Sequence, residues 1–142
     1  MKRDAMQELI KWKNDAERKP LVLRGARQVG KTWLMKEFGK SCYQNFVYFN
    51  FDEEDELRSI FAANKNPQRI LELLAMVSGE KILQGETLII FDEIQECPEA
   101  LNALKYFKEK ASAYHVIAAG SLLGTLLAKP KSYPVGMVNL LD

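Results

Sequence analysis

A stretch of eight residues near the N-terminus has the residue types and the spacing needed to bind phosphate. It runs Gly25-Ala26-Arg27-Gln28-Val29-Gly30-Lys31-Thr32 and fits Gly-x-x-x-x-Gly-Lys-Ser/Thr at every position. The two glycines let backbone N–H groups turn inward around an anion, and a helix beginning near Lys31 adds its positive end. Lys31 is suited to the β- and γ-phosphates of a nucleotide, and the Thr32 hydroxyl to Mg²⁺. We therefore predict a nucleotide site formed by residues 25–32 together with Trp33, the next residue.

The surroundings of this stretch favour a phosphate-binding loop over an ordinary glycine turn. Residues 20–24, Pro-Leu-Val-Leu-Arg, are typical of a short buried strand that enters the loop. Residues 32–40 follow with a helical pattern in which Leu34 and Phe38 face inward and Gly39 lies near the end. A strand, a glycine-containing loop and a helix, in this order, are the context that the motif requires.

An acidic pair about sixty residues after Thr32 supplies the second half of a nucleotide site. Asp92 and Glu93 follow the apolar run of residues 87–91, Thr-Leu-Ile-Ile-Phe, which indicates a strand covered on both faces in a parallel sheet. This is a Walker B pattern, in which Asp92 holds Mg²⁺ through water. Glu93, turned to the other side of the strand end, is suited to orient or deprotonate an attacking water. Without the loop upstream, a turn ending a strand would explain the pair equally well.

The elements that must position these residues alternate between strands and helices. Apolar β-type runs at 20–24, 45–51, 87–91 and 115–120 predict strands, and residues 138–142 resemble a further one. Helical patterns lie between them, over about 32–40, after the acidic run 52–56 through about residue 63, over 67–79 and over 98–111. An α/β fold with three layers, a mostly parallel central sheet and right-handed crossovers follows. The whole of 1–142 is expected to form one domain, an N-terminal helix over 4–17 followed by a core over 20–142.

Apolar stripes predict which side of each helix faces the core. In the first helix, capped by Asp4, the residues Met6, Leu9, Ile10 and Lys13 lie at helical spacing, with charged residues elsewhere. In the helix that begins at Pro67 and stops near Gly79, the stripe is Ile70, Leu73, Leu74 and Val77. In the helix that begins at Pro98, it is Ala100, Leu101, Leu104, Phe107 and Ala111.

Four segments far apart in the sequence are expected to meet at one edge of this sheet. In parallel α/β sheets the ligand lies outside the carboxyl ends of the strands. The loop at 25–32, Asn50, the pair Asp92 and Glu93, and Ser121 each follow a predicted strand. The predicted fold alone therefore places these candidate residues close together at the carboxyl edge of the sheet.

Charge and composition exclude several classes of protein. Twenty basic and nineteen acidic residues leave a net charge of +1, so overall charge does not favour nucleic acid. Lys11, Lys13, Arg18 and Lys19 make the first helix and its exit basic, which indicates a solvated face, or else a surface for nucleic acid or a partner. The mixed N-terminus is not a secretory signal, and no apolar run is long enough to cross a bilayer.

Cysteine and acidic residues give no clear metal site of their own. Cys42 and Cys97, with the single histidine His115, indicate neither a zinc site nor a disulfide framework, and the expected location is the reducing cytoplasm. Residues 52–56, Asp-Glu-Glu-Asp-Glu, suggest a metal site, but acidic residues are also favoured at the N-terminus of the helix that follows.

Taken together, these motifs resemble the AAA-type ATPase domain of a large bacterial and archaeal group. The resemblance covers nearly the whole chain and rests on residues 25–32, Asn50-Phe51-Asp52, Phe91-Asp92-Glu93-Ile94-Gln95, Ala119-Gly120-Ser121 and Tyr133-Pro134-Val135-Gly136. It implies an additional-strand P-loop NTPase fold that hydrolyses ATP with Mg²⁺. In that group a separate C-terminal domain, often nuclease-like in fold, typically follows. We therefore expect a chain truncated before the helical lid, with an effector domain missing.

The resemblance also implies roles for two polar residues, so that the expected catalytic set is Glu93, Lys31, Asn50 and Ser121. Ser121 corresponds in position to a polar sensor of the γ-phosphate, although it also fits a simple turn residue. Asn50 corresponds to the residue on the neighbouring strand that holds the catalytic glutamate inactive until a partner binds. It also fits a strand-end cap.

One departure from the AAA pattern limits what the chain is expected to do alone. No arginine follows Arg69, so neither a lid arginine nor an arginine finger lies in the usual late position. Weak nucleotide binding and slow hydrolysis are therefore expected. A homo-oligomer is possible as the assembly state, and DNA or a protein is possible as the partner. Two other functions stay open: a switch that binds ATP without turnover, and a small-molecule kinase, although kinases commonly carry an arginine-rich lid and have less use for Glu93.

Overall fold

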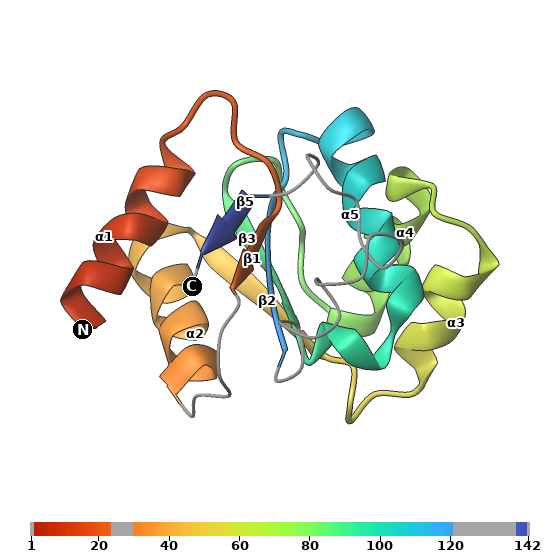
Figure 1. The fold of residues 1–142 in the computed structure, drawn as a ribbon. Helices are drawn as coiled ribbons and strands as arrows, with labels where there is room; N and C mark the ends of the chain where they lie inside the picture. The colour runs from red at the N-terminus through yellow and green to blue at the C-terminus, as the bar shows by residue number, and fades with distance from the viewer. Residues whose placement is uncertain (1, 24–29, 121–138, 142) are drawn as a thin grey trace.

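The computed structural model describes residues 2–23, 30–120 and 139–141 (Figure 1). In chain order the elements are α1 (Lys2–Lys13), β1 (Leu21–Leu23), α2 (Gly30–Cys42), β2 (Asn45–Asn50), α3 (Glu56–Ala63), α4 (Pro67–Ser78), β3 (Thr87–Asp92), the short 3-10 helix η1 (Ile94–Glu96), α5 (Pro98–Lys110), β4 (His115–Ala119) and β5 (Asn139–Leu141). The predicted alternation of strands and helices is confirmed.

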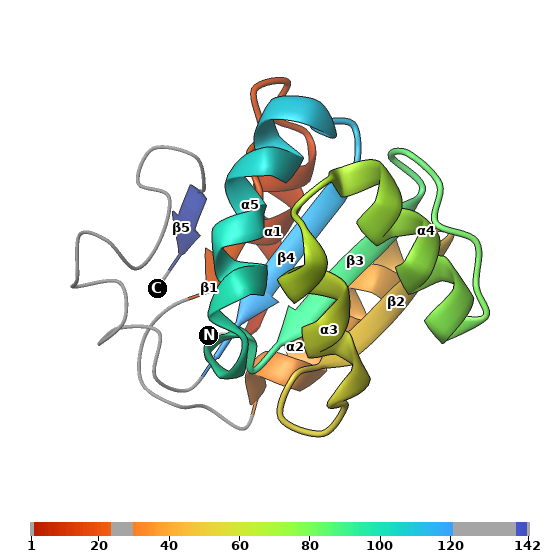
Figure 2. The same ribbon diagram turned by 90° about the vertical axis from the view of Figure 1, so that its right-hand side faces the viewer.

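Among the described residues the sheet has five strands in the order β2-β3-β4-β1-β5, and every neighbouring pair is parallel. Strand β4, late in the sequence, lies between β1 and β3, so an additional strand separates the strand before the phosphate loop from the strand before Asp92. Helices α1 and α2 cover one face, and α3, α4 and α5 cover the other, as Figures 1 and 2 show. The three-layer α/β fold expected from the sequence is confirmed.

Side chains of the inner strands alternate between two apolar cores, one on each face of the sheet. Along β3, which is buried at every position, Leu88 and Ile90 pack in the core beneath α1 and α2, whereas Ile89 and Phe91 pack in the core beneath α3, α4 and α5. Successive residues of a strand point to opposite faces. The alternation continues to the end of β3 and places Asp92 on the face that α2 covers.

Aromatic rings fix the carboxyl end of β3 from the other face. The Phe91 ring lies 5.5–6.3 Å, between centroids, from the rings of Phe49, Phe51, Phe61 and Phe107. These rings come from β2 and its exit, α3 and α5, and tilted or edge-on aromatic pairs add stability beyond the area that they bury. The strand end that carries Asp92 is therefore packed against aromatic rings from three neighbouring parts of the chain.

The predicted ends of α4 are confirmed by their caps. Asn66 accepts a hydrogen bond at Oδ1 from the Gln68 N–H, 3.0 Å away, and Pro67 occupies the first helical position. Gly79 ends the helix with φ at 71°, a left-handed conformation that glycine adopts without strain.

The predicted first helix, 4–17 with Asp4 as its cap, is wrong at both ends. Helix α1 runs over Lys2–Lys13, and Asp4 lies within its first turn. The guanidinium of Arg18 donates to the Lys13 carbonyl at 3.2 Å, which satisfies one of the last carbonyls and ends the helix early. Leu9 and Trp12 are buried, while Ile10 is 38% exposed. Burial of the large Trp12 ring sets the rotation of the helix.

Two further predictions of inward-facing residues are wrong, one on α2 and one on α4. On α2, Leu34 is only partly buried and Met35 fills the core beside Phe38, because Met35, Phe38 and Gly39 form the stripe that faces the sheet. On α4, Val77 is exposed and Leu71 is buried, because the helix passes the edge of the core before it ends. The five inward positions predicted for α5 and its end are all buried. Within the described ranges, no helix has the length and apolar character to cross a membrane.

Candidate nucleotide-binding site

The buried carboxylate of Asp92 joins the elements that carry the two sequence motifs. Its Oδ2 accepts hydrogen bonds from the Thr32 hydroxyl on α2 and from the Tyr48 hydroxyl on β2, each at 2.6 Å. Its Oδ1 accepts the backbone N–H of Glu93 at 3.0 Å. Asp92 is only 4% exposed, so these contacts replace water around the carboxylate. The loop motif and the acidic pair, sixty residues apart, therefore meet.

Strand register explains why these residues meet. Strands β2 and β3 pair with Tyr48 beside Ile90 and Asn50 beside Asp92. Because side chains two apart along a strand share a face, Tyr48 and Asn50 both lie on the face of the sheet that carries Asp92. Helix α2 covers that face and carries Thr32 in its first turn. The expected meeting of the Asn50 and Asp92 strand ends at one edge is confirmed.

Tyr48 is a site residue that sequence reasoning missed. Its ring lies under the ammonium of Lys36, whose Nζ is 4.1 Å from the ring centroid, and Asn50 Nδ2 donates to its hydroxyl oxygen at 3.4 Å. Burial, together with the hydrogen bond to Asp92, raises the pKa of Tyr48 far above its ordinary value. The hydroxyl therefore keeps its proton and donates it. The predicted strand places Tyr48 on the same face as Asn50, but only the pairing of β2 with β3 brings its hydroxyl to Asp92.

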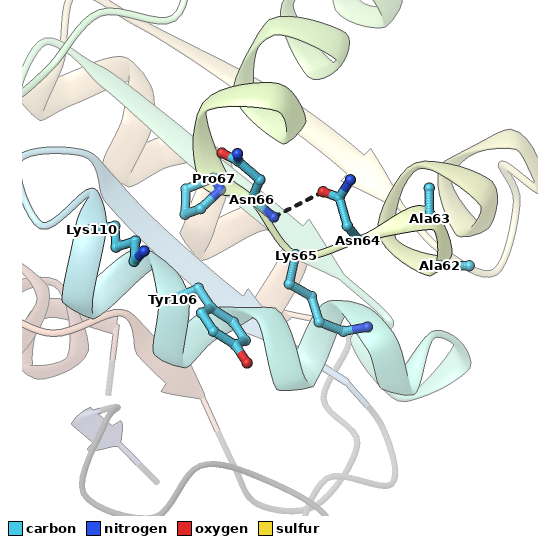
Figure 3. Close-up of a pocket in the computed structure, with 8 residues that line it drawn as sticks. All are labelled: Ala62, Ala63, Asn64, Lys65, Asn66, Pro67, Tyr106 and Lys110. Carbon is cyan, nitrogen blue, oxygen red and sulfur yellow. Dashed lines mark hydrogen bonds between the residues drawn. The ribbon is translucent and has the colours of Figure 1, made fainter.

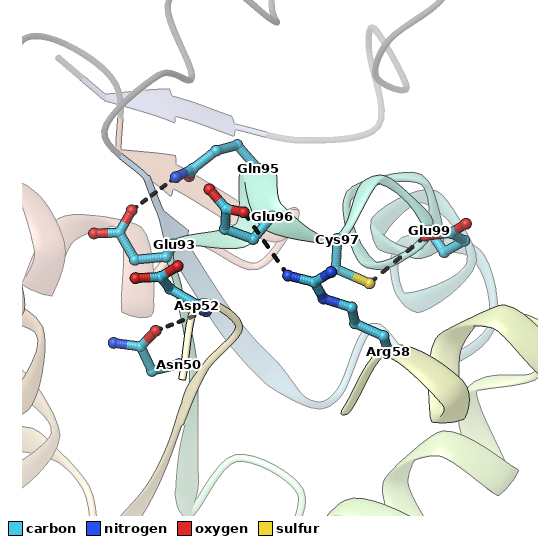
Figure 4. A network of polar contacts seen from close by, with 8 residues as sticks. All are labelled: Asn50, Asp52, Arg58, Glu93, Gln95, Glu96, Cys97 and Glu99. Carbon is cyan, nitrogen blue, oxygen red and sulfur yellow. Dashed lines mark hydrogen bonds and ion pairs between the residues drawn. The ribbon is translucent and has the colours of Figure 1, made fainter. Parts of the chain in front are cut away.

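Glu93 follows β3 in an unusual backbone conformation. Its φ of 52° and ψ of 44° are left-handed, the only such values at a non-glycine position among the residues that the structure describes. The Gln95 side chain donates from Nε2 to Glu93 Oε1 at 2.8 Å (Figure 4). Strained conformations of this kind gather at functional sites, where surrounding contacts hold them in place. The turn directs the Glu93 carboxylate toward Gln95 at the same edge of the sheet.

The contacts of Asn50 are those of a residue that shapes the end of β2. Its Oδ1 accepts the Asp52 N–H at 2.9 Å, which forms an Asx turn, and its own N–H donates to Glu54 Oε2 at 3.1 Å. Figure 4 shows Asn50 and Asp52 at the strand edge that also carries Glu93. The strand-end cap considered for Asn50 is thus observed, and its action on Glu93 stays a prediction.

The acidic run 52–56 leads into α3, with Asp55 just before the helix and Glu56 in its first turn. Across the described ranges 2–23, 30–120 and 139–141, no group of three or more histidine, cysteine or acidic side chains is placed to hold a metal ion. The favourable position of acidic residues at a helix N-terminus explains the run.

Thr32 and Asp92 offer the donor set that magnesium prefers. Mg²⁺ takes oxygen ligands and is usually held by one or two protein groups together with water and phosphate. Because the Thr32 hydroxyl donates its proton to Asp92, the lone pairs of its oxygen are available to a cation. The carboxylate beside it supplies negative charge at low exposure. The residues present therefore fit a magnesium ion.

The structure describes only some of the other predicted site residues. Gly30 is the first residue of α2, and Lys31 follows it, half-buried, in the first turn. Trp33 is 49% exposed. The remaining loop residues, Gly25, Ala26, Arg27, Gln28 and Val29, lie outside the described residues, as do Ser121 and the segment 133–136.

A separate pocket of about 400 Å³ lies at the connection between α3 and α4 and against α5 (Figure 3). Lys65, Asn66, Tyr106 and Lys110 are among its lining residues. None of the residues around Asp92 contributes to it, so this pocket is distinct from the candidate nucleotide site.

Comparison with known proteins agrees with this geometry. Residues 17–142 match the family described as AAA domain. Among solved structures, the Walker-type ATPase PABY2304 of Pyrococcus abyssi has a similar fold, with a TM-score of 0.61 and 16% identity over 99% of this chain. The match covers 52% of that chain, so the present chain spans about half its length. No curated protein is significantly similar to this sequence. Since the family match extends over most of the residues, the chain belongs to the AAA domain family and is an ATP-binding P-loop module.

Proposed function

We propose that the chain binds ATP together with Mg²⁺ and hydrolyses it. The observation that carries this proposal is the 2.6 Å hydrogen bond from Thr32 to Asp92. It joins the first turn of the helix after the phosphate loop to the end of the strand before the acidic pair. If residues 25–32 formed an ordinary glycine turn with no ligand, a hydrogen bond between a threonine and a buried aspartate at this edge of the sheet would have no explanation.

The proposed roles follow from where each side chain lies. Lys31, in the first turn of α2, neutralises the β- and γ-phosphates, and the backbone of residues 25–30 surrounds them. Thr32 and Asp92 hold the magnesium ion. A bound magnesium ion offsets the charge that develops as the terminal phosphoryl group departs. In this proposal Ser121 contacts the γ-phosphate, and Trp33 lies against the nucleotide.

Glu93 has the proposed role of orienting or deprotonating the attacking water. Its carboxylate follows Asp92 directly and is held by Gln95 at 2.8 Å. A positioned carboxylate of this kind contributes to the rate without contributing to ground-state affinity. Asn50, beside Asp92 in the strand register, completes the proposed catalytic set.

Two substitutions separate nucleotide binding from hydrolysis. Glu93→Gln is expected to keep ATP affinity while turnover falls by a hundredfold or more, on the order of a general base's contribution. Lys31→Ala is expected to lose affinity, because it removes the positive charge from the phosphate site. Calorimetric titration with ATP and a phosphate-release assay measure the two effects.

The outcomes of this experiment discriminate between functions. Equal turnover in the wild type and in Glu93→Gln contradicts the general-base assignment. Tight binding without any turnover in the wild type instead indicates a nucleotide-dependent switch. Absence of ATP binding in the wild type contradicts the whole proposal.

We further propose that the module drives or switches an effector domain beyond residue 142, often nuclease-like in the group that its motifs resemble. The fact that the chain spans about half of the P. abyssi structure supports this. Reading the coding sequence past Asp142 tests it. A second subunit is the proposed source of the missing arginine finger, and DNA or a protein is the proposed target.

A further inference from the structure

The Tyr48 hydroxyl is the second proton donor to Asp92 Oδ2. Tyr48 and Thr32 approach this oxygen from different elements, β2 and α2, and both donor–acceptor distances are 2.6 Å. Distances this short are typical of hydrogen bonds in which a hydroxyl donates to an ionised carboxylate. Neither sequence motif contains Tyr48. We infer that Tyr48 is a positioning residue that holds the Asp92 carboxylate in the orientation needed to bind magnesium.

The hydrogen bonds of the carboxylate show why a second donor matters. A carboxylate has about four lone-pair sites. Within the described part of the chain, Oδ2 accepts from Thr32 and Tyr48, and Oδ1 accepts from the Glu93 N–H. Three sites are thus filled by protein donors, and one on Oδ1 is left for a cation or its water. The bonding pattern therefore selects which oxygen faces the metal.

Thr32 cannot fix this orientation alone. Its oxygen is itself a proposed magnesium ligand, so its position depends on whether the ion is bound. Tyr48 belongs to β2, which pairs with β3 along the whole strand from Asn45 to Asn50, and its ring is covered by the Lys36 ammonium. It therefore supplies an anchor that does not move with the metal. Outer hydrogen bonds of this kind orient the groups that bind a metal and raise its affinity.

The test measures magnesium dependence of binding and not only catalysis, and it rests on the proposed function of the site. Affinity of the 142-residue chain for the non-hydrolysable analogue AMP-PNP is measured by calorimetry, first in EDTA and then across a magnesium titration. For Tyr48→Phe we expect unchanged affinity in EDTA and a magnesium midpoint about tenfold higher, as for other outer-shell partners of metal ligands. The ring over which Lys36 lies is retained.

Tyr106→Phe is the matched control, because Tyr106 also lies beside a lysine, with Lys105 Nζ at 5.0 Å from its ring centroid, but belongs to α5 on the opposite face. It is expected to leave the magnesium midpoint unchanged. Melting temperatures of all variants are recorded under the same conditions. A lower melting temperature for Tyr48→Phe with an unchanged magnesium midpoint shows a purely structural role and overturns the inference.

A double-mutant cycle gives the second, independent measurement. If Tyr48 acts through Asp92, adding Tyr48→Phe to Asp92→Ala produces no further loss of magnesium dependence. A full additional tenfold loss in that background overturns the inference. Failure of the proposed function is recognised separately, because in that case the wild type itself gains no affinity from magnesium.

Discussion

At the residue scale, Asp92 shows both the reach and the limit of sequence reasoning. Thr32, Asp92 and Glu93 could be found because each belongs to a motif whose spacing follows from the chemistry of phosphate and magnesium. Tyr48 could not be found in this way, because its role depends on strand pairing that brings it beside a residue forty-four positions away. A sequence motif therefore predicts residues proposed to contact a ligand more readily than it predicts residues that position those side chains.

Glu93 carries a prediction about stability that is separate from catalysis. Its φ of 52° is left-handed, a conformation that costs an L-residue with a side chain roughly 1 kcal/mol and costs glycine little. Glu93→Gly and Glu93→Ala both remove the carboxylate and are both expected to lose turnover. We expect the glycine variant to be more stable than the alanine variant by about 1 kcal/mol, as measured by urea unfolding. An alanine variant of equal or greater stability would contradict a strained backbone at Glu93.

At the element scale, α2 has to meet two requirements at its two ends. Its first turn carries Lys31 and Thr32, and its last turns must pack tightly enough on β2 to keep Thr32 beside Asp92. Gly39 makes the close packing possible, since a Cβ built there would lie 2.7 Å from the Cβ of Phe46. The sequence pattern placed Gly39 near the end of a helix that was expected to stop at residue 40. The observed helix continues to Cys42, so packing on β2 is what requires glycine.

Gly39→Ala is therefore expected to destabilise the protein although alanine favours helix. Helix propensity favours alanine by about 1 kcal/mol, but overpacking against Phe46 costs typically 1–3 kcal/mol, so a net loss of roughly 1 kcal/mol is expected. The displaced helix should also weaken the magnesium dependence of nucleotide binding. Lys40→Ala, at an exposed position of the same helix, is the control and should change stability little. Chemical denaturation measures both, and a stabilised Gly39→Ala variant would show that α2 has room on β2.

At the scale of the whole molecule, local patterns predicted which elements form but not how the strands are ordered. Sequence runs gave β2, β3 and β4 to within a residue of their ends. Strands β3 and β4 are buried at every position and are nearly continuously apolar, whereas the partly buried β2 is rich in aromatic and β-branched residues. The order β2-β3-β4-β1-β5 depends on pairings such as Leu21 with Ile117, which no local pattern encodes, and the family resemblance implied only that an additional strand is present. The C-terminal end of α1 was mispredicted for a different reason, because local hydrogen bonds from Arg18 to the Lys13 carbonyl and from Trp12 to the Lys19 carbonyl shape the chain that leaves the helix.

A buried histidine makes the stability of the molecule depend on pH. His115, on β4, is 6% exposed and is joined to the Tyr43 hydroxyl by a 2.6 Å hydrogen bond at Nδ1. Burial, with the positive charges of Arg18 and Lys13, lowers the pKa of His115 from 6.5 to about 4. As the pH falls, the His115 side chain therefore becomes protonated near pH 6.5 in the unfolded chain but only near pH 4 in the folded protein. Acid consequently favours unfolding in that interval.

We expect the titration of His115 to leave the unfolding free energy independent of pH above pH 6.5 and to lower it between pH 6.5 and 4, by up to roughly 3 kcal/mol. Urea unfolding at several pH values measures this for the wild type and for His115→Gln, which cannot titrate. The difference between the two proteins should shrink as the pH falls through the interval. Parallel curves would show that His115 titrates alike in the folded and unfolded states.

The unequal exposure of the two tryptophans has a practical consequence. Trp12 is 7% exposed and its indole N–H is bonded to the Lys19 carbonyl, whereas Trp33 is 49% exposed and follows Thr32 directly. Aqueous quenchers such as iodide therefore reach one indole and not the other. The emission that they suppress comes from the start of α2, so the chain carries an intrinsic optical probe beside its phosphate loop and needs no attached dye.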